Sequence, residues 1–404
     1  MDHMDYAYFD GRYYCYYGLI PALFFYVPYV ALTGQLVYSY WVVLVCAAVF
    51  IPSSFAFIYR LIRKFRGEVS LDTYLLLSLL FINCCGFLTY VKRPVVYSVP
   101  YAMSYCLIVL GLYFWLTACD KEKMSVVKLI LGAVMIAMTL GTRPVFMITL
   151  LLAFPIFADR IKKGDFFRLK AASIVNTSAV IVPFLVIDIP LLFYNKARFG
   201  SFLDFGSKYN LTRDLLDDRF ILERIPGGIY TYFFQPMNIN ASYPFIHAIN
   251  DKNIFPTDYQ GAVYNELFAG GLFFVIPFCI ALFFIPLVIG SMKKNRSRFI
   301  VFTLIGISIF LALVDIEFAG IANRYLTDFS IFMLIAAVIV VLSVRNKDTV
   351  RLRKAFFVIC LLTIFLAYFL LLSDGRSLTM RYNMPNGFGY FKYNTAPAPG
   401  RPSW

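Results

Sequence analysis

The sequence predicts an all-α membrane protein that crosses the bilayer many times, and three observations lead to this. Of its 404 residues, 60% are hydrophobic and 15% are charged, whereas a soluble domain carries roughly 25% charged residues. The apolar residues gather in runs long enough to cross a bilayer core of about 30 Å as helices. Short charged loops separate these runs, and every second loop is basic.

The net charge of +14 follows the same pattern. Residues 60–68, 120–128, 159–170, 293–298 and 345–354 together hold 21 basic and 6 acidic residues. Cytoplasmic loops of membrane proteins carry such an excess of lysine and arginine. We therefore expect these five loops in the cytoplasm and residues 195–266 outside it. Because the positive charge is explained by topology, we expect no nucleic-acid partner.

The sequence offers little for a metal ion or a cofactor. Six of the eight cysteines lie within apolar runs, and none falls between residues 195 and 266, so no disulfide framework is indicated. With two histidines in the chain, a histidine metal centre is not expected. The sequence has no motif for nucleotide phosphates, dinucleotides, zinc hydrolysis or serine hydrolysis. We therefore assign no metal-binding residue and no cofactor.

Residues 1–35 open the chain with an acidic, tyrosine-rich stretch followed by an apolar one. The apolar part, residues 18–34, is about as long as the shortest helical span, and it contains Pro21 and Pro28. We expect a helix or hairpin lying on the membrane surface; the alternative is a kinked span. With residues 60–68 in the cytoplasm, residues 1–35 lie outside. We therefore also expect an apolar helix upstream of this sequence.

Ten further apolar runs form two blocks, with about six spans in residues 36–194 and about four in residues 267–372. With the alternative span near the start, the bundle has about ten or eleven helices. Residues 195–266 and the tail, residues 373–404, are expected on the outer side. The sequence G-T-R-P is expected to form a tight outer turn between two short spans. The ten runs are residues 36–59, 71–91, 96–116, 126–140, 145–157, 171–194, 267–290, 299–314, 325–344 and 356–372.

Ionisable residues near the expected outer surface are the candidates for chemistry, because charges beside a bilayer are costly and usually functional. Among the carboxylates Asp188 stands out, since it lies inside an apolar run. Asp315, Glu317 and Arg324 have an alternative role, because they can neutralise one another. The alternating charges of residues 213–224 are typical of a solvated helix face, and we assign them no role.

Two aromatic clusters with glycine and charge lie outside the expected spans. They are Y-A-Y-F-D-G-R-Y-Y-C-Y-Y-G at residues 6–18 and R-F-G-S-F-L-D-F-G-S-K-Y at residues 198–209. An aromatic belt at the lipid interface is one explanation. The other is ligand binding, because aromatic faces with carboxylates suit sugars and arginine can hold a phosphate through two N–H groups.

Four stretches of the chain resemble one family of enzymes. They are D-Y-A-Y-F-D-G-R-Y-Y-C-Y-Y-G-L-I-P-A-L at residues 5–23, G-T-R-P at 141–144, Y-N-K-A-R-F-G-S-F-L-D-F-G-S-K-Y at 194–209 and N-R-Y-L-T-D-F at 323–329. Together they resemble bacterial polytopic glycosyltransferases of the GT-C fold, the relatives of protein O-mannosyltransferases and lipid A aminoarabinose transferases. The A-R-F-G…F-G…Y block is the most telling.

The resemblance implies a GT-C-like helical bundle in the bacterial cytoplasmic membrane. Such enzymes move a sugar from a polyprenyl-phosphate carrier to an acceptor outside the membrane, which is a cell-envelope glycan, a lipid or a protein. The implied mechanism is inversion, with a carboxylate as general base and cations stabilising the departing phosphate. Some relatives use a divalent cation and others do not, so the resemblance leaves that point open.

Carried over to this chain, the resemblance makes Asp5 and Asp10 the candidate catalytic acids. The catalytic carboxylate of the family usually follows soon after the first transmembrane helix, so we expect its position upstream of Met1. The second outer loop of relatives often carries another acid, whereas residues 92–94 have none. The candidate substrate-binding residues are Arg198 and Arg324 for the phosphate, Arg143 behind them, and Asn195, Tyr209 and Tyr325.

The rival hypothesis is a transporter, flippase or polymerase for a polyprenyl-linked glycan. It predicts internal repeats and charges deep within the spans. The sequence has no clear repeat, and its charges keep to one surface. The transferase is therefore the favoured interpretation.

Overall fold

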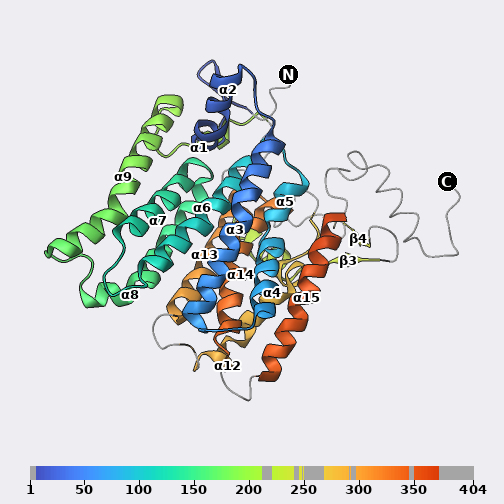
Figure 1. Cartoon of the computed structure of the whole chain (residues 1–404). Helices are drawn as coiled ribbons and strands as arrows, with labels where there is room; N and C mark the ends of the chain where they lie inside the picture. Colours follow the sequence, from blue (N-terminus) through green and yellow to red (C-terminus); the bar gives the residue numbers. More distant parts are fainter. Residues whose placement is uncertain are drawn as a thin grey trace, which may run out of the picture. The chain divides into compact units, whose positions relative to one another are not determined.

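The computed structural model of the chain describes residues 6–211, 221–240, 245–247, 249, 268–290, 292, 297–344 and 350–372. Most of these residues are helical, and the described part contains two small two-stranded sheets. The chain forms two compact units, and each unit is made from two separate stretches of sequence (Figure 1). The first unit comprises Met1–Lys64 and Pro94–Leu216, and the second comprises Phe65–Arg93 and Asp217–Trp404.

Seven helices in the described part are long and apolar enough to cross a membrane. This agrees with the predicted all-α polytopic class, because a helix satisfies its own backbone hydrogen bonds within lipid. The seven are Ser39–Phe65, Ser98–Ala118, Pro144–Lys163, Ala171–Phe199, Ser297–Phe318, Asn323–Leu342 and Lys354–Leu371. Four shorter apolar helical segments are Leu19–Thr33, Leu71–Cys84, Val126–Gly141 and Pro277–Val288.

The first unit begins with a β-hairpin that the sequence analysis did not predict. Its turn consists of Asp10 and Gly11, whose φ angles are 49° and 74°. Positive φ at both central residues matches a type I′ turn, for which Asp-Gly is a preferred pair. The elements of this unit are β1 (Ala7–Phe9), β2 (Arg12–Tyr14), α1 (Leu19–Pro21), η1 (Ala22–Tyr26), α2 (Val27–Thr33), α3 (Ser39–Phe65), α6 (Ser98–Ala118), α7 (Val126–Met138), η2 (Thr139–Gly141), η3 (Pro144–Leu152), α8 (Ala153–Lys163), α9 (Ala171–Phe199) and η4 (Ser207–Tyr209).

Within this unit α7 lies between α6 and α9 (Figure 1). The close contact of α6 and α7 depends on Gly132, because a Cβ atom added there would lie 2.2 Å from Cδ1 of Trp115. The indole Nε1–H of Trp115 donates to the carbonyl of Leu129 at 3.3 Å. The largest side chain of the interface is therefore both packed and hydrogen-bonded.

Helix α9 is longer than predicted. The apolar run predicted a span over residues 171–194 and a loop from residue 195, but the helix continues to Phe199. Its last turn carries Lys196 and Arg198, where positive side chains interact favourably with the helix dipole. The helix ends at Gly200, which is left-handed. Asn195 and Arg198 therefore lie on a helix and not in a loop.

The second unit is built around α14, and 94% of the most apolar stretch of this helix is buried. The run predicted as one span over residues 71–91 is divided at Gly86, whose φ is 110°. The elements of this unit are α4 (Leu71–Cys84), α5 (Phe87–Lys92), α10 (Arg224–Ile229), η5 (Tyr230–Phe234), β3 (Asn238–Ile239), β4 (Ile246–His247), α11 (Leu272–Val275), η7 (Pro277–Phe284), α12 (Ile285–Val288), α13 (Ser297–Phe318), α14 (Asn323–Leu342) and α15 (Val350–Leu372).

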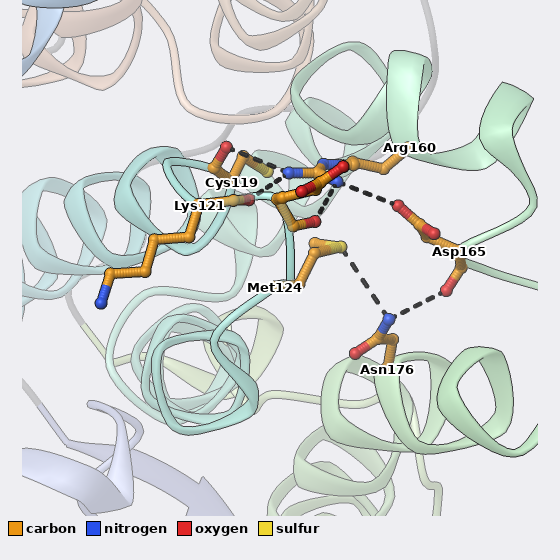
Figure 2. A network of polar contacts seen from close by, with 7 residues as sticks. Cys119, Lys121, Met124, Arg160, Asp165 and Asn176 are labelled. Carbon is orange, nitrogen blue, oxygen red and sulfur yellow. Dashed lines mark hydrogen bonds and ion pairs between the residues drawn. The ribbon is translucent and has the colours of Figure 1, made fainter.

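Two loops predicted to be cytoplasmic meet in a network of polar contacts around Arg160 (Figure 2). Arg160 donates to the carbonyls of Cys119, at 3.4 Å, and of Glu122, at 2.7 Å. It also donates to the carbonyl of Lys121 and pairs with Asp165 at 3.2 Å. This guanidinium therefore joins the α6–α7 loop to the segment between α8 and α9, as expected if both lie on one side of a membrane.

Candidate functional site

Arg198, at the end of α9, holds the N-terminal segment in place. Its Nη1 donates to the carbonyl of Cys15 at 3.0 Å, and its Nη2 donates to Oδ1 of Asn195 at 2.8 Å. Its guanidinium carbon lies 4.1 Å from the ring centre of Tyr194 and 4.7 Å from that of Phe199. The planar fork is thus engaged by two acceptors and two aromatic faces, an arrangement that lysine does not reproduce.

An aromatic cluster joins the hairpin to the segment that follows α9. The ring of Phe9 lies 4.5 Å from that of Tyr209, and Phe199 lies 5.4 Å from Tyr14 and 5.6 Å from Tyr209. Gly206 completes the cluster, because its φ is +86° and an added Cβ would lie 2.3 Å from Cζ of Phe199. Two of the four stretches that carry the family resemblance therefore form one structure.

The backbone adds to this connection. Ala7 of β1 and Asn210 form an antiparallel bridge, and the N–H of Leu211 donates to the carbonyl of Tyr6 at 3.1 Å. Nδ2 of Asn210 also donates to the hydroxyl of Tyr16 at 3.1 Å. The segment after η4 therefore runs beside the hairpin and is joined to β1 by an isolated bridge.

The turn between α9 and η4 is fixed by Asp204. Its Oδ1 accepts from the N–H of Gly206 at 3.0 Å, and its Oδ2 lies 2.8 Å from Nζ of Lys208. Burial opposes the charged form, but the hydrogen bonds from Lys208, Gly206 and Tyr209 outweigh it and lower the pKa of Asp204 below its ordinary value. The same pairing raises the pKa of Lys208. Both groups are therefore charged at neutral pH.

The G-T-R-P turn lies beneath the start of α1. A Cβ added to Gly18 would lie 2.1 Å from the carbonyl oxygen of Gly141, so the two chain segments touch through their backbones. The hydroxyls of Thr142 and Ser104 lie 2.6 Å apart. The guanidinium carbon of Arg143 lies 4.1 Å from the ring centre of Tyr101. The predicted tight turn is present, and it anchors the N-terminal segment to α6.

Asp188 lies on the inward face of α9, together with Leu191 and Asn195. Its side chain belongs to a residue that is 8% exposed, and neither carboxylate oxygen has a hydrogen-bond partner in the described chain. Leu191, one turn further along, approaches Gly141. Asp188 is ten residues before Arg198 along the helix, which corresponds to about 15 Å. The sequence analysis singled out this carboxylate because it lies inside an apolar run, and the structure places it among the buried residues of α9.

The remaining predicted residues lie in the second unit, at the start of α14. Nη2 of Arg324 donates to the hydroxyl of Tyr325 at 3.0 Å, and its guanidinium carbon lies 4.8 Å from the same ring. Thr327 donates to the carbonyl of Arg324 and forms a hydrogen bond with the hydroxyl of Tyr90. Oδ1 of Asn323 accepts from the N–H of Ala269 at 3.0 Å. The N-R-Y-L-T motif thus ties α14 to α5 and to the segment before α11.

A stripe of three residues on α10 and η5 packs along the end of α13. Nη1 of Arg224 donates to the carbonyl of Glu317 at 3.3 Å, and the hydroxyl of Tyr232 donates to the carbonyl of Gly320 at 2.7 Å. Between them, a Cβ added to Gly228 would lie 2.6 Å from side-chain atoms of Ile316. Residues at i, i+4 and i+8 share one helical face, and this face covers carbonyls left open at the helix end.

The stripe corrects one expectation. The charges of residues 213–224 were expected on a solvated helix face. Residues 213–220 lie outside the described residues, and of the remaining charges Glu223 is exposed but Arg224 is only 5% exposed. The sequence analysis considered only the alternating charges of that stretch. The packed face instead follows the spacing of four residues from Arg224 to Gly228 and Tyr232. Burial raises the pKa of Tyr232 well above its ordinary value, and the nearby carboxylate of Asp315 adds to this.

The structure also bears on the alternative that Asp315, Glu317 and Arg324 neutralise one another. Oε2 of Glu317 accepts from the backbone N–H of Ile221 at 3.0 Å, and its carboxylate makes no ion pair with a described residue. Arg324 therefore does not neutralise Glu317.

The structure thus places the predicted site residues in three groups. Asn195, Arg198 and Tyr209 meet around the hairpin, Asp10 lies in the hairpin turn, and Arg143 lies in the G-T-R-P turn, all within the first unit. Asp10 itself is exposed in the hairpin turn. Arg324 and Tyr325 belong to the second unit. Asp5 lies outside the described residues.

The described residues contain no group of three or more histidine, cysteine, aspartate or glutamate side chains able to hold a metal. Comparison of the chain with protein-family models, curated proteins and solved structures found no significant match in any of the three.

Proposed function

We propose that the chain is an integral membrane glycosyltransferase of the bacterial cytoplasmic membrane. It has a GT-C-like bundle of about ten or eleven helices, and it moves a sugar from a polyprenyl-phosphate carrier to an acceptor on the outer side. The acceptor is a cell-envelope glycan, lipid or protein. This proposal starts from the four stretches of sequence that resemble such enzymes.

One observation supports the proposal above the others. The Y-F-D-G-R-Y-Y hairpin and the A-R-F-G…F-G…Y block are about 190 residues apart in sequence, yet they form one cluster held by Arg198 and by Phe199. Segments that only formed an aromatic belt in lipid would have no need to interlock. The cluster instead gives the outer segments a fixed shape, as a site requires.

The chemistry of the proposal assigns a role to each kind of residue. A carboxylate, Asp5 or Asp10, takes the proton of the acceptor hydroxyl as general base. Arg143 and Arg198 in the first unit, and Arg324 in the second, are each candidates for the positive charge that stabilises the departing lipid phosphate. Tyrosine faces such as that of Tyr209 stack on the sugar. The bond from the anomeric carbon to the phosphate breaks as the bond to the acceptor oxygen forms.

The test uses the full chain in proteoliposomes with undecaprenyl-phosphate monosaccharides that carry a radiolabelled sugar. An envelope extract supplies the acceptors. We expect label to leave the lipid fraction with at least one sugar, and we expect Arg324→Ala to abolish this. Arg324→Lys should impair transfer almost as much, because lysine keeps the charge but loses the planar fork. Normal transfer by Arg324→Lys, with poor membrane abundance of Arg324→Ala, would contradict the phosphate role.

A second candidate function is favoured by Asp188. Ionisable groups deep within spans are typical of transporters and proton relays, and Asp188 lies well inside α9 with no described hydrogen-bond partner. In the same proteoliposomes, a transporter would move the labelled lipid-linked sugar between leaflets without releasing the sugar. Movement that Asp188→Asn abolishes, in the absence of covalent transfer, would establish this second function.

A further inference from the structure

The segment between α8 and α9, in the first unit, exposes two large apolar side chains. Phe167 is 65% exposed, and Leu169, at 98%, is the most exposed large apolar residue in the described part of the chain. The helical segments on either side, Pro144–Lys163 and Ala171–Phe199, are both long and apolar enough to cross a membrane. A segment that joins two such helices lies at the membrane surface, so its apolar side chains are within reach of lipid.

The segment has a fixed shape, because α9 holds its backbone. The hydroxyl of Thr177 accepts from the N–H of Phe167 at 3.0 Å, and the hydroxyl of Ser173 accepts from the N–H of Arg168 at 2.9 Å. Asp165, at the beginning of the segment, belongs to the polar network of Figure 2. The exposed side chains are therefore presented by a structured turn.

Phe167 also has a backbone conformation that a large side chain rarely adopts. Its φ is 58°, in the left-handed region, where a residue other than glycine is strained. Phe166, in contrast, is 4% exposed, and its ring lies 5.1 Å from that of Phe157. Of two successive phenylalanines, one packs in the core and the other is held outside it at a cost in free energy. Strain of this kind is a reason to look for a function of the exposed side chain.

Basic side chains alternate with the exposed apolar ones. Phe167, Arg168, Leu169 and Lys170 follow one another in sequence, and all four are exposed. Lys170 directly precedes α9, and a positive charge at the N-terminus of a helix opposes the helix dipole. Within the described chain, neither Arg168 nor Lys170 makes an ion pair. The two charges therefore do not stabilise the helix that they precede.

This combination matches the surface of an anionic membrane. Apolar side chains together with lysine and arginine are typical of segments that lie at the level of anionic headgroups. The Cα atoms of successive residues are about 3.8 Å apart, so one lipid surface can contact all four side chains. A phospholipid with a net negative charge offers its headgroup to Arg168 and Lys170 and its acyl chains to Phe167 and Leu169.

We propose that residues 167–170 form a binding site for anionic phospholipid, which anchors the first unit at the membrane surface. The positive-inside rule places this segment on the cytoplasmic side, so the lipid belongs to the inner leaflet. The inference does not depend on the proposed sugar transfer, because it concerns the opposite side of the membrane and a different ligand.

The test compares two lipids that differ in charge. The full chain in a neutral detergent is titrated with phosphatidylglycerol and with phosphatidylcholine, and thermal unfolding gives an apparent Kd for each. We expect phosphatidylglycerol to bind about tenfold or more tightly than phosphatidylcholine, because each basic side chain beside an anionic surface strengthens binding roughly fivefold. Equal affinities for the two lipids would overturn the inference.

Two double variants separate this segment from the general effect of positive charge. Arg168→Gln with Lys170→Gln should weaken binding of phosphatidylglycerol about tenfold or more and leave phosphatidylcholine unaffected. The matched control is Arg351→Gln with Lys354→Gln, which removes two exposed charges from the start of α15 in the second unit. We expect the control to change the Kd by less than about twofold. Equal losses in the two double variants would show that charge alone attracts the lipid and would contradict a site at residues 167–170.

Phe167→Asn tests the apolar part of the site. Asparagine tolerates the left-handed conformation better than phenylalanine does, so the unfolding temperature without lipid should stay the same or rise. Binding of phosphatidylglycerol should nevertheless weaken about tenfold, because the exposed ring no longer enters the acyl region. A lower unfolding temperature with unchanged lipid binding would show that Phe167 is structural and would overturn the inference. Should the glutamine variant of the segment not accumulate in membranes, Phe167→Asn decides alone.

Discussion

At the residue scale, Arg198 has two competing roles: binding of a lipid phosphate and positioning of the N-terminal segment. The sequence places it where a lipid phosphate would arrive, and the structure engages its fork with Cys15 and Asn195. The hydrogen bonds to Cys15 and Asn195 use Nη1 and Nη2, the two nitrogens that a bidentate phosphate contact also prefers. In the structure as it stands, Arg198 therefore positions the N-terminal segment.

Replacing Arg198 by lysine tests this positioning role. We expect Arg198→Lys and Arg198→Ala to destabilise the chain by about 1–3 kcal/mol, because hydrogen bonds to a charged group are lost and lysine cannot serve both acceptors. Thermal unfolding in detergent measures the change. Lys196→Ala, at an exposed position on the same turn, is the control. An unaltered unfolding temperature for Arg198→Lys would show that the contacts to Cys15 and Asn195 do not stabilise the fold.

Asp204 gives a prediction about pH. Its pKa is lowered in the folded chain, so the stability that it contributes is present above the unfolded pKa of about 3.9. This stability is lost as the pH falls through the folded pKa. We expect the turn after α9 to loosen only under acid conditions. Proteolysis of that turn between pH 7 and pH 3 provides the measurement.

Asp204→Asn should make the same turn protease-sensitive already at pH 7, since it removes the charge that pairs with Lys208. The variant should also remove most of the pH dependence. A wild-type turn that becomes labile at neutral pH, or an Asp204→Asn chain with the same acid transition, would contradict this explanation.

At the scale of single elements, contacts between helices depend on small residues that hydropathy does not distinguish. Gly132 allows Trp115 to lie against α7, and no apolar pattern in the sequence marks it. Gly306, in α13, has open space around its Cβ position. The same residue type therefore has opposite consequences in two helices.

This contrast can be measured directly. Gly132→Ala should destabilise the chain by about 1–3 kcal/mol, because the new methyl group overpacks the α6–α7 interface. Gly306→Ala should be neutral or stabilising, by up to about 1 kcal/mol, because alanine favours a helix. Both variants are compared by chemical unfolding in detergent. Equal effects of the two substitutions would mean that Trp115 can move away without cost.

These elements also show what the sequence can predict. Long apolar runs located the helices, because burial in lipid requires such runs wherever the chain crosses. They did not locate the ends of α9 or the break at Gly86, since local capping and turn geometry decide these. The Asp10-Gly11 pair is a hairpin signal in the sequence. The sequence analysis did not use this signal, because the pair lies in an aromatic, acidic segment at the start of the chain.

The contacts of the candidate site were harder to predict from the sequence than the helices were. The hydrogen bond from Arg198 to Cys15 joins residues 183 positions apart, and no local pattern specifies such a partner. The stripe of Arg224, Gly228 and Tyr232 acquires meaning only beside the end of α13. Residue types suggested candidate side chains, and the fold was needed to say what each contacts.

At the scale of the whole molecule, each unit collects loops of one predicted side at one end. In the first unit Arg160 joins two predicted cytoplasmic loops, and Arg198 joins two predicted outer segments. In the second unit Arg66 donates to the carbonyl of Val344, which joins two further predicted cytoplasmic loops. This grouping follows from the alternation of loops along the chain.

Reporter fusions test the predicted orientation. Fusions at Lys64, Lys163, Lys294 and Arg351 should report cytoplasm, because basic loops are retained on that side. Fusions at Ser242 and Phe391 should report the outer side. A cytoplasmic signal from Ser242 would overturn the orientation, and with it the outer placement of every candidate site residue.

The composition of the second unit from two distant stretches has a consequence for biosynthesis. Helix α4 packs against α15 within this unit (Figure 1), yet the ribosome makes α15 last among the described helices. At a rate of roughly 5–20 residues per second, α4 waits about 15–60 s for this partner. During that interval the face of α4 that α15 later covers must be held by lipid or by the insertion machinery. A chain that stalls before residue 350 would therefore leave this face exposed to quality control.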